Sequence, residues 1–112
     1  MNFITLQGED QLTEIKAADG LSIIFKHNTT CPISKGVKRL LEEDGDNLPE
    51  DVPVYILDLL SHRSISDRIA EEFNVKHESP QLLLIKDGKC PYHKALYEIT
   101  VDETAAAIDS SR

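Results

Sequence analysis

Apolar residues along the chain alternate between strand-like runs and helical stripes. Short runs rich in branched and aromatic residues predict strands, and apolar residues three and four positions apart predict helices. The predicted strands are Phe3–Leu6, Leu21–His27, Val52–Leu60, Leu82–Lys86 and Cys90–Ile99. The predicted helices are Gln11–Ala18, Pro32–Glu43, a third with the stripe Ile65, Ile69, Ala70 and Phe73, and Val101–Ser110. This alternation is typical of an α/β protein.

Three local signals refine this arrangement. Val52–Leu60 is almost entirely apolar, so we expect a central strand that is covered on both faces and parallel to its neighbour. The dipeptide Asp87–Gly88 between the last two strands predicts a hairpin. Ser64 is expected to cap the third helix, and either Thr100 or Asp102 the last one.

The order of the elements predicts the fold. A βαβαβ segment followed by ββα corresponds to a parallel crossover unit, an antiparallel hairpin and a closing helix. This is the thioredoxin-like three-layer α/β/α architecture with a mixed central sheet (βαβαββα). Since 112 residues is the length of one domain, residues 1–112 are predicted to form a single thioredoxin-like domain.

Composition and charge narrow the classes of function. The net charge of −8 argues against nucleic acid or an anionic membrane as a partner. No apolar run approaches the ~20 residues of a membrane span, and Met1–Thr5 lacks the basic start of a signal peptide. Two cysteines do not make a disulfide scaffold. We therefore expect a cytoplasmic protein.

Cys31 stands at the junction between a predicted strand and a predicted helix, which places it at the helix N-cap. Pro32 suits the first helical position because its missing N–H is not needed there. We expect the sulphur to face the unpaired amides of the first turn, where the helix dipole favours a thiolate. Cys31 is therefore predicted to be a reactive nucleophile rather than a small buried hydrophobic residue.

Basic residues surround this cysteine in the sequence. No Asp or Glu occurs between Gly20 and Leu41, and the segment carries Lys26, Lys35, Lys38 and Arg39. A basic patch in an acidic chain is suited to hold an anion near the thiol.

Two further positions belong to the predicted site. Ser34 stands where a Cys-x-x-Cys motif has its second cysteine. Its hydroxyl either donates to the Cys31 sulphur or, as in an ordinary first-turn serine, bonds to backbone. Ser79–Pro80 directly precedes a strand, and a thioredoxin-like layout puts it opposite Cys31. A cis bond there would aim the neighbouring backbone at whatever is bound to the sulphur.

His77 is either a proton-transfer or carboxylate-binding residue or a surface histidine without a role, and His27 has a similar status.

Other polar and thiol groups are given structural roles. The strand after Pro80 carries the chain about 20 Å from the site before Cys90, at ~3.3 Å per residue. A disulfide needs Cα atoms within ~7 Å, so Cys31 and Cys90 should not pair within one chain. Asp58, inside an apolar strand, needs a polar partner or water. The histidines and cysteines lack the paired spacing of metal ligands, so no metal site is predicted.

Three segments together resemble a known family. Thr30-Cys31-Pro32-Ile33-Ser34, Arg63–Ser66 and His77–Leu84 are similar to the YtxJ family, the monothiol bacilliredoxins of bacillithiol-producing bacteria. The resemblance spans nearly the whole chain, although Cys90–Tyr97 departs from the pattern of the family's fifth strand. It implies a thioredoxin fold, a nucleophilic cysteine at Cys31, and removal of bacillithiol from S-bacillithiolated client proteins.

The resemblance and the residues imply the same chemistry. The thiolate attacks a mixed disulfide, and a second small thiol then frees it. Bacillithiol is expected as co-substrate, and no bound cofactor is expected. The candidate residues are Cys31 as nucleophile; Thr30, Pro32, Ser34, Ser79 and Pro80 as support; and Lys26, Lys35, Lys38 and His77 for the two malate carboxylates of bacillithiol.

Two alternatives stay open. A glutathione-linked or iron–sulfur monothiol glutaredoxin typically carries Cys-Gly-Phe-Ser, whereas Pro32 here stiffens the loop and removes an amide. A non-catalytic thioredoxin-fold adaptor would not depend on Cys31. The client proteins and the oligomeric state are not predicted.

Overall fold

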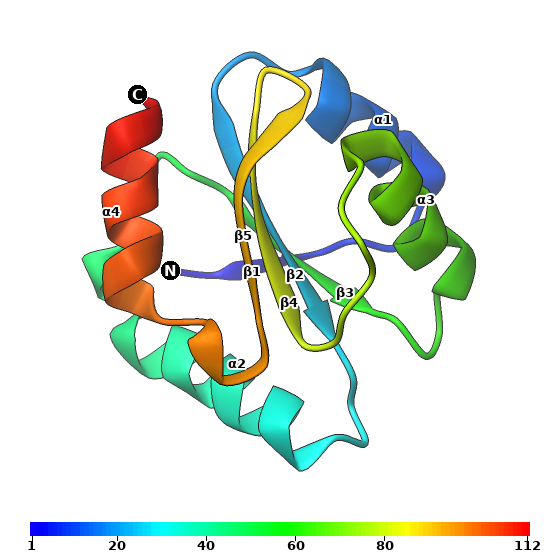
Figure 1. The fold of residues 1–112 in the computed structure, drawn as a ribbon, viewed down its shortest axis with the longest axis horizontal. Helices are drawn as coiled ribbons and strands as arrows, with labels where there is room; N and C mark the ends of the chain where they lie inside the picture. Colours follow the sequence, from blue (N-terminus) through cyan, green and yellow to red (C-terminus); the bar gives the residue numbers. More distant parts are fainter.

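The computed structural model describes residues 1–112 as a mixed five-stranded sheet with helices on both faces (Figure 1). The strands are β1 (Phe3–Thr5), β2 (Leu21–His27), β3 (Val54–Asp58), β4 (Gln81–Lys86) and β5 (Lys89–Ala95). The helices are α1 (Glu9–Ala17), α2 (Pro32–Asp44), α3 (Arg63–Phe73) and α4 (Val101–Ser111), with short 3₁₀ turns η1 (Gly45–Asn47) and η2 (Leu96–Glu98). Figure 1 shows α2 and α4 on one side of the sheet and α1 and α3 on the other.

The sheet has the strand order β1-β3-β2-β4-β5. β3 runs parallel to both β1 and β2, whereas β4 is antiparallel to β2 and to β5. The predicted thioredoxin-like α/β/α architecture is therefore confirmed. The observed order is βαβαβαββα, which has one strand and one helix more than βαβαββα. The additional helix is α3, because the stripe that begins at Ile65 forms a full crossover between β3 and β4.

The strand predicted over Val52–Leu60 forms inside the sheet and is parallel to its neighbours, as expected, but its length and its position in the middle of the sheet were predicted wrongly. The central strand is β2, and β3 is shorter than the apolar run. Val52 and Leu59 are buried from the segments that flank β3, so the apolar run continues beyond the strand itself. The apolar run is therefore longer than β3 because residues on both sides of the strand are buried in the core without pairing in the sheet.

Each face of the sheet buries its own hydrophobic core. On β2, Ile23 and Phe25 pack into the core under α2 and α4, whereas Ile24 packs into the core under α1 and α3. Successive side chains of a strand point to opposite faces. The same alternation sends Lys26 toward α3 and His27 toward α2, which determines the arrangement of the site described below.

Two helices begin earlier than the apolar stripes predicted. α1 starts at Glu9 because the Gln11 side chain accepts hydrogen bonds from the backbone N–H groups of Gln7 and Gly8. α3 starts at Arg63 with His62 at the N-cap, so the prediction that Ser64 caps it was wrong.

In the C-terminal part of the chain, the cap of the last helix agrees with the prediction and the end of the last strand does not. Thr100 caps α4 by accepting a hydrogen bond from the Glu103 N–H at 3.2 Å, which decides between the two predicted caps. β5 ends at Ala95, earlier than predicted, because Leu96 adopts a positive φ of 56° and begins η2. None of the helices is long and apolar enough to cross a membrane.

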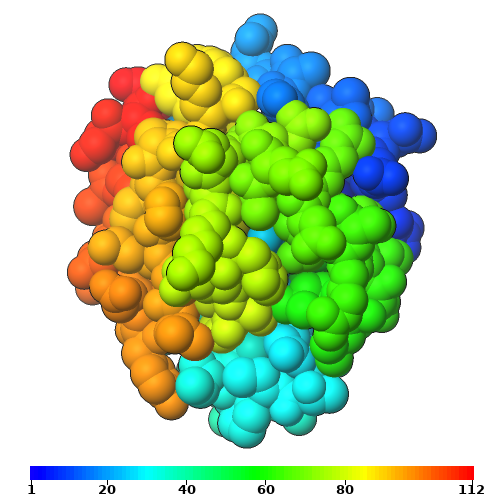
Figure 2. Space-filling model, turned by 45° about the vertical axis from the view of Figure 1, so that its right-hand side comes forward, coloured from blue at the N-terminus to red at the C-terminus, as the bar shows by residue number.

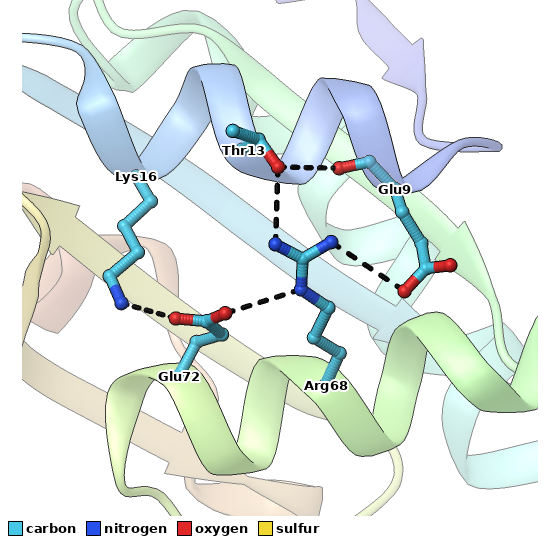
Figure 3. A network of polar contacts seen from close by, with 5 residues as sticks. All are labelled: Glu9, Thr13, Lys16, Arg68 and Glu72. Atoms are coloured by element: carbon cyan, nitrogen blue, oxygen red, sulfur yellow. Dashed lines mark hydrogen bonds and ion pairs between the residues drawn. The ribbon is translucent and has the colours of Figure 1, made fainter.

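A charged network links the outer surfaces of α1 and α3 (Figure 3). Arg68 contacts the carboxylates of Glu9 and Glu72 at 3.5 and 3.2 Å and donates to the Thr13 hydroxyl at 3.1 Å. Lys16 forms a second ion pair with Glu72. These side chains are partly exposed, and such pairs contribute only about 0–1 kcal/mol each. The apolar core beneath them is therefore the main link between the two helices.

Candidate active site

Cys31 is the N-cap residue of α2, and Pro32 occupies the first helical position, as predicted. The loop before it is closed by the Cys31 N–H, which donates to the Asn28 carbonyl at 3.1 Å. Thr30 supports the same turn through hydrogen bonds from its N–H and its hydroxyl to Asn28 Oδ1. Cys31 itself is half-buried and forms no disulfide. The residue is therefore partly accessible to solvent at the start of the helix.

One detail of the predicted thiol environment was wrong. The Cys31 side chain accepts no capping hydrogen bond from the first turn of α2. Pro32 has no N–H to donate, and the structure does not fold the sulphur back onto the amides that follow. The helix dipole is then the remaining local contribution of α2 to a thiolate at this position.

Ser34 is fully buried and joins α2 to the end of β2. Its Oγ lies 2.7 Å from His27 Nδ1 and accepts a hydrogen bond from the Asn28 N–H at 2.9 Å. Of the two predicted roles of Ser34, the bond to backbone is observed, with the N–H of Asn28 at the end of β2, whereas no bond to the Cys31 sulphur is formed. The missed partner is His27, which strand alternation places on the α2 face.

The imidazole of His27 is buried and stacks on Phe25. Burial lowers the pKa of His27, and the positive charge of Lys38 acts in the same direction. His27 is therefore uncharged at neutral pH and serves Ser34 as a neutral hydrogen-bond partner.

Ser79–Pro80 has a cis peptide bond, which the sequence left undecided. Gln81, the next residue, pairs with Lys26 in the β2–β4 ladder, so the dipeptide lies at the end of the sheet from which the chain leads to Cys31. In both overall views the segment before β4 and the start of α2 lie at the same end of the molecule (Figures 1 and 2). The Pro80 carbonyl accepts a hydrogen bond from the Leu96 N–H at 3.0 Å.

Lys26 does not join the predicted basic patch. It is fully buried on the α3 side of the sheet, where its Nζ donates to the Ser66 carbonyl at 3.1 Å. Burial lowers the pKa of Lys26 from 10.5 to about 8, while the carboxylate of Asp67 acts in the opposite direction. The basic residues left on α2 are the exposed Lys35 and Arg39 and the half-buried Lys38.

His77 lies in the loop before Ser79–Pro80 and contacts Lys26. Its Nδ1 is 3.2 Å from Lys26 Nζ and 3.3 Å from Ser66 Oγ. Burial of the ring and the charge of Lys26 lower the pKa of His77, in that order of size. No local pattern indicates the contact between His77 and Lys26, because 51 residues separate them.

Removal of the buried charge should stabilise the fold. Between pH 8 and 10.5 the unfolded chain holds a proton on Lys26 that the native state lacks, so wild-type stability rises with pH in this window. Below pH 8 Lys26 is charged in the native state, and burial of this charge costs roughly 3 kcal/mol of stability. Replacement of Lys26 by an apolar residue removes this cost but also removes its hydrogen bonds, which reduces the gain by ~1 kcal/mol. We expect Lys26→Met to be more stable by about 2 kcal/mol at pH 7 and to lose this advantage by pH 10.5. Urea unfolding across this pH range measures the difference, and a less stable variant at pH 7 would contradict it.

An apolar groove of about 410 Å³ begins beside Cys31. It runs between the first turns of α2 and the segment around η2, and its lining is Pro32, Ile33, Gly36, Val37, Leu40, Tyr97 and Ile99. Tyr97, which lines this groove, is 79% exposed. No local sequence pattern indicates this groove, because it joins residues of α2 to residues more than fifty positions later. A larger hollow of about 670 Å³ lies at the opposite end of the sheet, and its lining includes Gly20, Pro53 and Arg112.

Cys90 lies beside the β4–β5 hairpin, away from Cys31, and both cysteines are free, in agreement with the prediction that they do not pair. Burial raises the pKa of Cys90 to about 11, so its thiol stays protonated at neutral pH.

Asp58 has the polar partners that its place in an apolar strand requires: its carboxylate accepts hydrogen bonds from the Leu60 N–H and the Ser61 hydroxyl. No group of three or more His, Cys, Asp or Glu side chains is placed to hold a metal ion.

The geometry is that of a single accessible cysteine at a helix start, with serine in place of a resolving cysteine. A family model described as monothiol bacilliredoxin BrxC matches residues 4–104, which include the whole site. The chain belongs to this family. The resemblance noted from the Cys31 and Pro80 segments to the monothiol bacilliredoxins is thereby confirmed at the level of the family.

Solved structures agree with the bacilliredoxin fold. A thioredoxin-fold protein assigned as an oxidoreductase is 31% identical over 93% of this chain and 91% of its own, with a TM-score of 0.78. Thioredoxin (Mala s 13) from Malassezia sympodialis is 18% identical over 98% and 90% of the two chains, with the same TM-score. A mutant thioredoxin from Halobacterium salinarum is 16% identical over 96% and 88%, with a TM-score of 0.74. Bacilliredoxin family membership and this fold support a thiol redox role.

Proposed function

We propose that the protein is a thiol–disulfide oxidoreductase that removes bacillithiol from S-bacillithiolated proteins with Cys31 as its only reacting thiol. One observation carries the proposal: the accessible thiol at the start of α2 has no second thiol within reach. Ser34 occupies the adjacent partner position, and Cys90 lies by the distant hairpin. A single reacting thiol can exchange only through an intermolecular mixed disulfide, which supports a small thiol as the second reactant.

The reaction balances with two exchanges. The Cys31 thiolate attacks the bacillithiol sulphur of the client's mixed disulfide, that S–S bond breaks, and the client thiolate leaves and takes a proton. The adduct on Cys31 is then attacked by the thiolate of a second bacillithiol. A bacillithiol disulfide leaves and the Cys31 thiolate is restored. No bound cofactor takes part, and we expect this chemistry in the cytoplasm, where client thiols are kept reduced.

The surroundings of Cys31 suit the two parts of the substrate. The apolar groove that begins at Pro32 fits apolar side chains of a client protein. Lys35 and Lys38 on α2 provide positive charge for the malate carboxylates of bacillithiol. The backbone beside Pro80 offers hydrogen bonds to an extended segment held at the sulphur.

Intact mass spectrometry tests this function. After exposure to a bacillithiolated protein, we expect one bacillithiol adduct per chain, located on Cys31 by peptide mapping. A Cys90→Ala control should take up the same adduct. Absence of any adduct, or an adduct on Cys90, would refute the proposal. A protein that binds clients without taking up bacillithiol would instead favour the adaptor alternative.

A further inference from the structure

A buried ammonium group lies under the loop that leads to Ser79–Pro80. Lys26 is fully buried, yet two polar atoms lie within hydrogen-bond distance of its Nζ: the Ser66 carbonyl at 3.1 Å and His77 Nδ1 at 3.2 Å. A buried lysine is costly unless its donors are used, so this position needs an explanation. The strand alternation that buries Lys26 also removes it from the surface where it would meet a ligand directly.

The contact with Lys26 fixes the form of the His77 ring. An ammonium group only donates hydrogen bonds, so Nδ1 of His77 must accept and its proton must reside on Nε2. With a pKa of about 8, Lys26 is mostly protonated at pH 7 and holds this tautomer. The charge of Lys26 also opposes protonation of the ring. His77 therefore keeps one N–H donor, on the ring nitrogen opposite the buried contact.

The loop is held by further contacts around the same point. Gln81, fully buried and paired with Lys26 across the β2–β4 ladder, donates through Nε2 to the Lys76 carbonyl at 3.0 Å. The Ser66 hydroxyl lies 3.3 Å from His77 Nδ1. The loop is thus held at Lys76 by the Gln81 side chain and at His77 itself by Lys26 and Ser66.

Given the proposed function, we propose that Lys26 is a positioning residue that orients His77, whose Nε2–H then donates a hydrogen bond to a carboxylate of the small thiol carried on Cys31. The loop of His77 ends at Ser79–Pro80, at the end of the sheet where Cys31 lies. A carboxylate is the acceptor that strengthens such a bond most, and bacillithiol brings two of them. Lys26 acts on the substrate only through the imidazole.

Steady-state kinetics with paired substrates tests this role. The substrates are one model peptide as its mixed disulfide with bacillithiol and the same peptide as its mixed disulfide with neutral 2-mercaptoethanol. We expect Lys26→Met and His77→Phe each to raise KM for the bacillithiol disulfide about tenfold relative to the neutral one, the effect of one charge-assisted hydrogen bond. The double variant should be no worse than either single variant, because both remove the same contact.

Two matched variants and one spectroscopic signal sharpen the test. His77→Gln places an amide N–H near the position of Nε2, so it should restore most of the affinity. Lys89→Met removes an exposed lysine at the distant hairpin and should leave both KM values unchanged. Nitrogen-15 NMR should show the Nε2–H tautomer of His77 in the wild type and a mixture of tautomers in Lys26→Met.

Equal KM ratios in the wild type and His77→Phe would overturn the inference. A parallel loss with both substrates would overturn it as well, since it would indicate a structural role alone. Failure of the proposed function looks different, because the wild-type protein would then not turn over the bacillithiol disulfide at all.

Discussion

Replacement of Cys31 by serine should abolish thiol exchange, with at least a ~10³-fold loss in the rate of bacillithiol release from a client protein. The hydroxyl of serine is far less acidic than a thiol and is not ionised at neutral pH, so no nucleophile remains at the start of α2. The change in volume is small and the side chain is half-buried, so the fold should be retained. Release of the small thiol from a bacillithiolated model protein, followed by mass spectrometry, measures the loss.

Cys90→Ser is the matched control for this prediction. The Cys90 thiol is protonated at neutral pH because burial raises its pKa to about 11, and it lies by the distant hairpin. Its replacement should leave the rate within about twofold, the range of an ordinary substitution remote from the site. Residual activity of Cys31→Ser above a tenth of the wild-type rate would show that the reaction does not pass through Cys31.

The fold was largely predictable because its signals are local. The apolar periodicity located every strand and helix, and the Asp87–Gly88 turn identified the hairpin. The errors arose where tertiary packing changes the meaning of a pattern. Val52 and Leu59 are apolar because loops next to β3 fill the core, not because the strand extends to them.

The site was predictable where it depends on the chain near Cys31, and not where it depends on the faces of the sheet. The N-cap position of Cys31 and the location of Ser79–Pro80 follow from short segments. Lys26 and His27 are adjacent in sequence, yet strand alternation puts one beneath α3 and the other against Ser34 on α2. Charges that look clustered in the sequence are therefore separated by the sheet.

Substitution of Ser34 by cysteine should change the reaction from a one-thiol to a two-thiol mechanism. Position 34 is three residues after Cys31 in the first turn of α2, which is the spacing of the Cys-x-x-Cys motifs that form disulfides at helix starts. A thiol held there acts at an effective concentration far above that of a millimolar thiol in solution. We expect bacillithiol to leave the adduct at least ~100-fold faster, and a disulfide between Cys31 and the introduced thiol to accumulate.

Rapid quenching followed by intact mass spectrometry distinguishes the two mechanisms. The wild-type protein should accumulate the adduct when no second thiol is supplied, whereas Ser34→Cys should show a chain two mass units lighter than its reduced form. Ser34→Ala is the matched control, because it removes the hydrogen bonds to His27 and Asn28 without adding a thiol. It should lose about 1 kcal/mol of stability and still accumulate the adduct. A stable adduct on Ser34→Cys would mean that His27 or the buried position of residue 34 keeps its side chain from the Cys31 sulphur, so that serine there is not the feature that makes this a one-thiol protein.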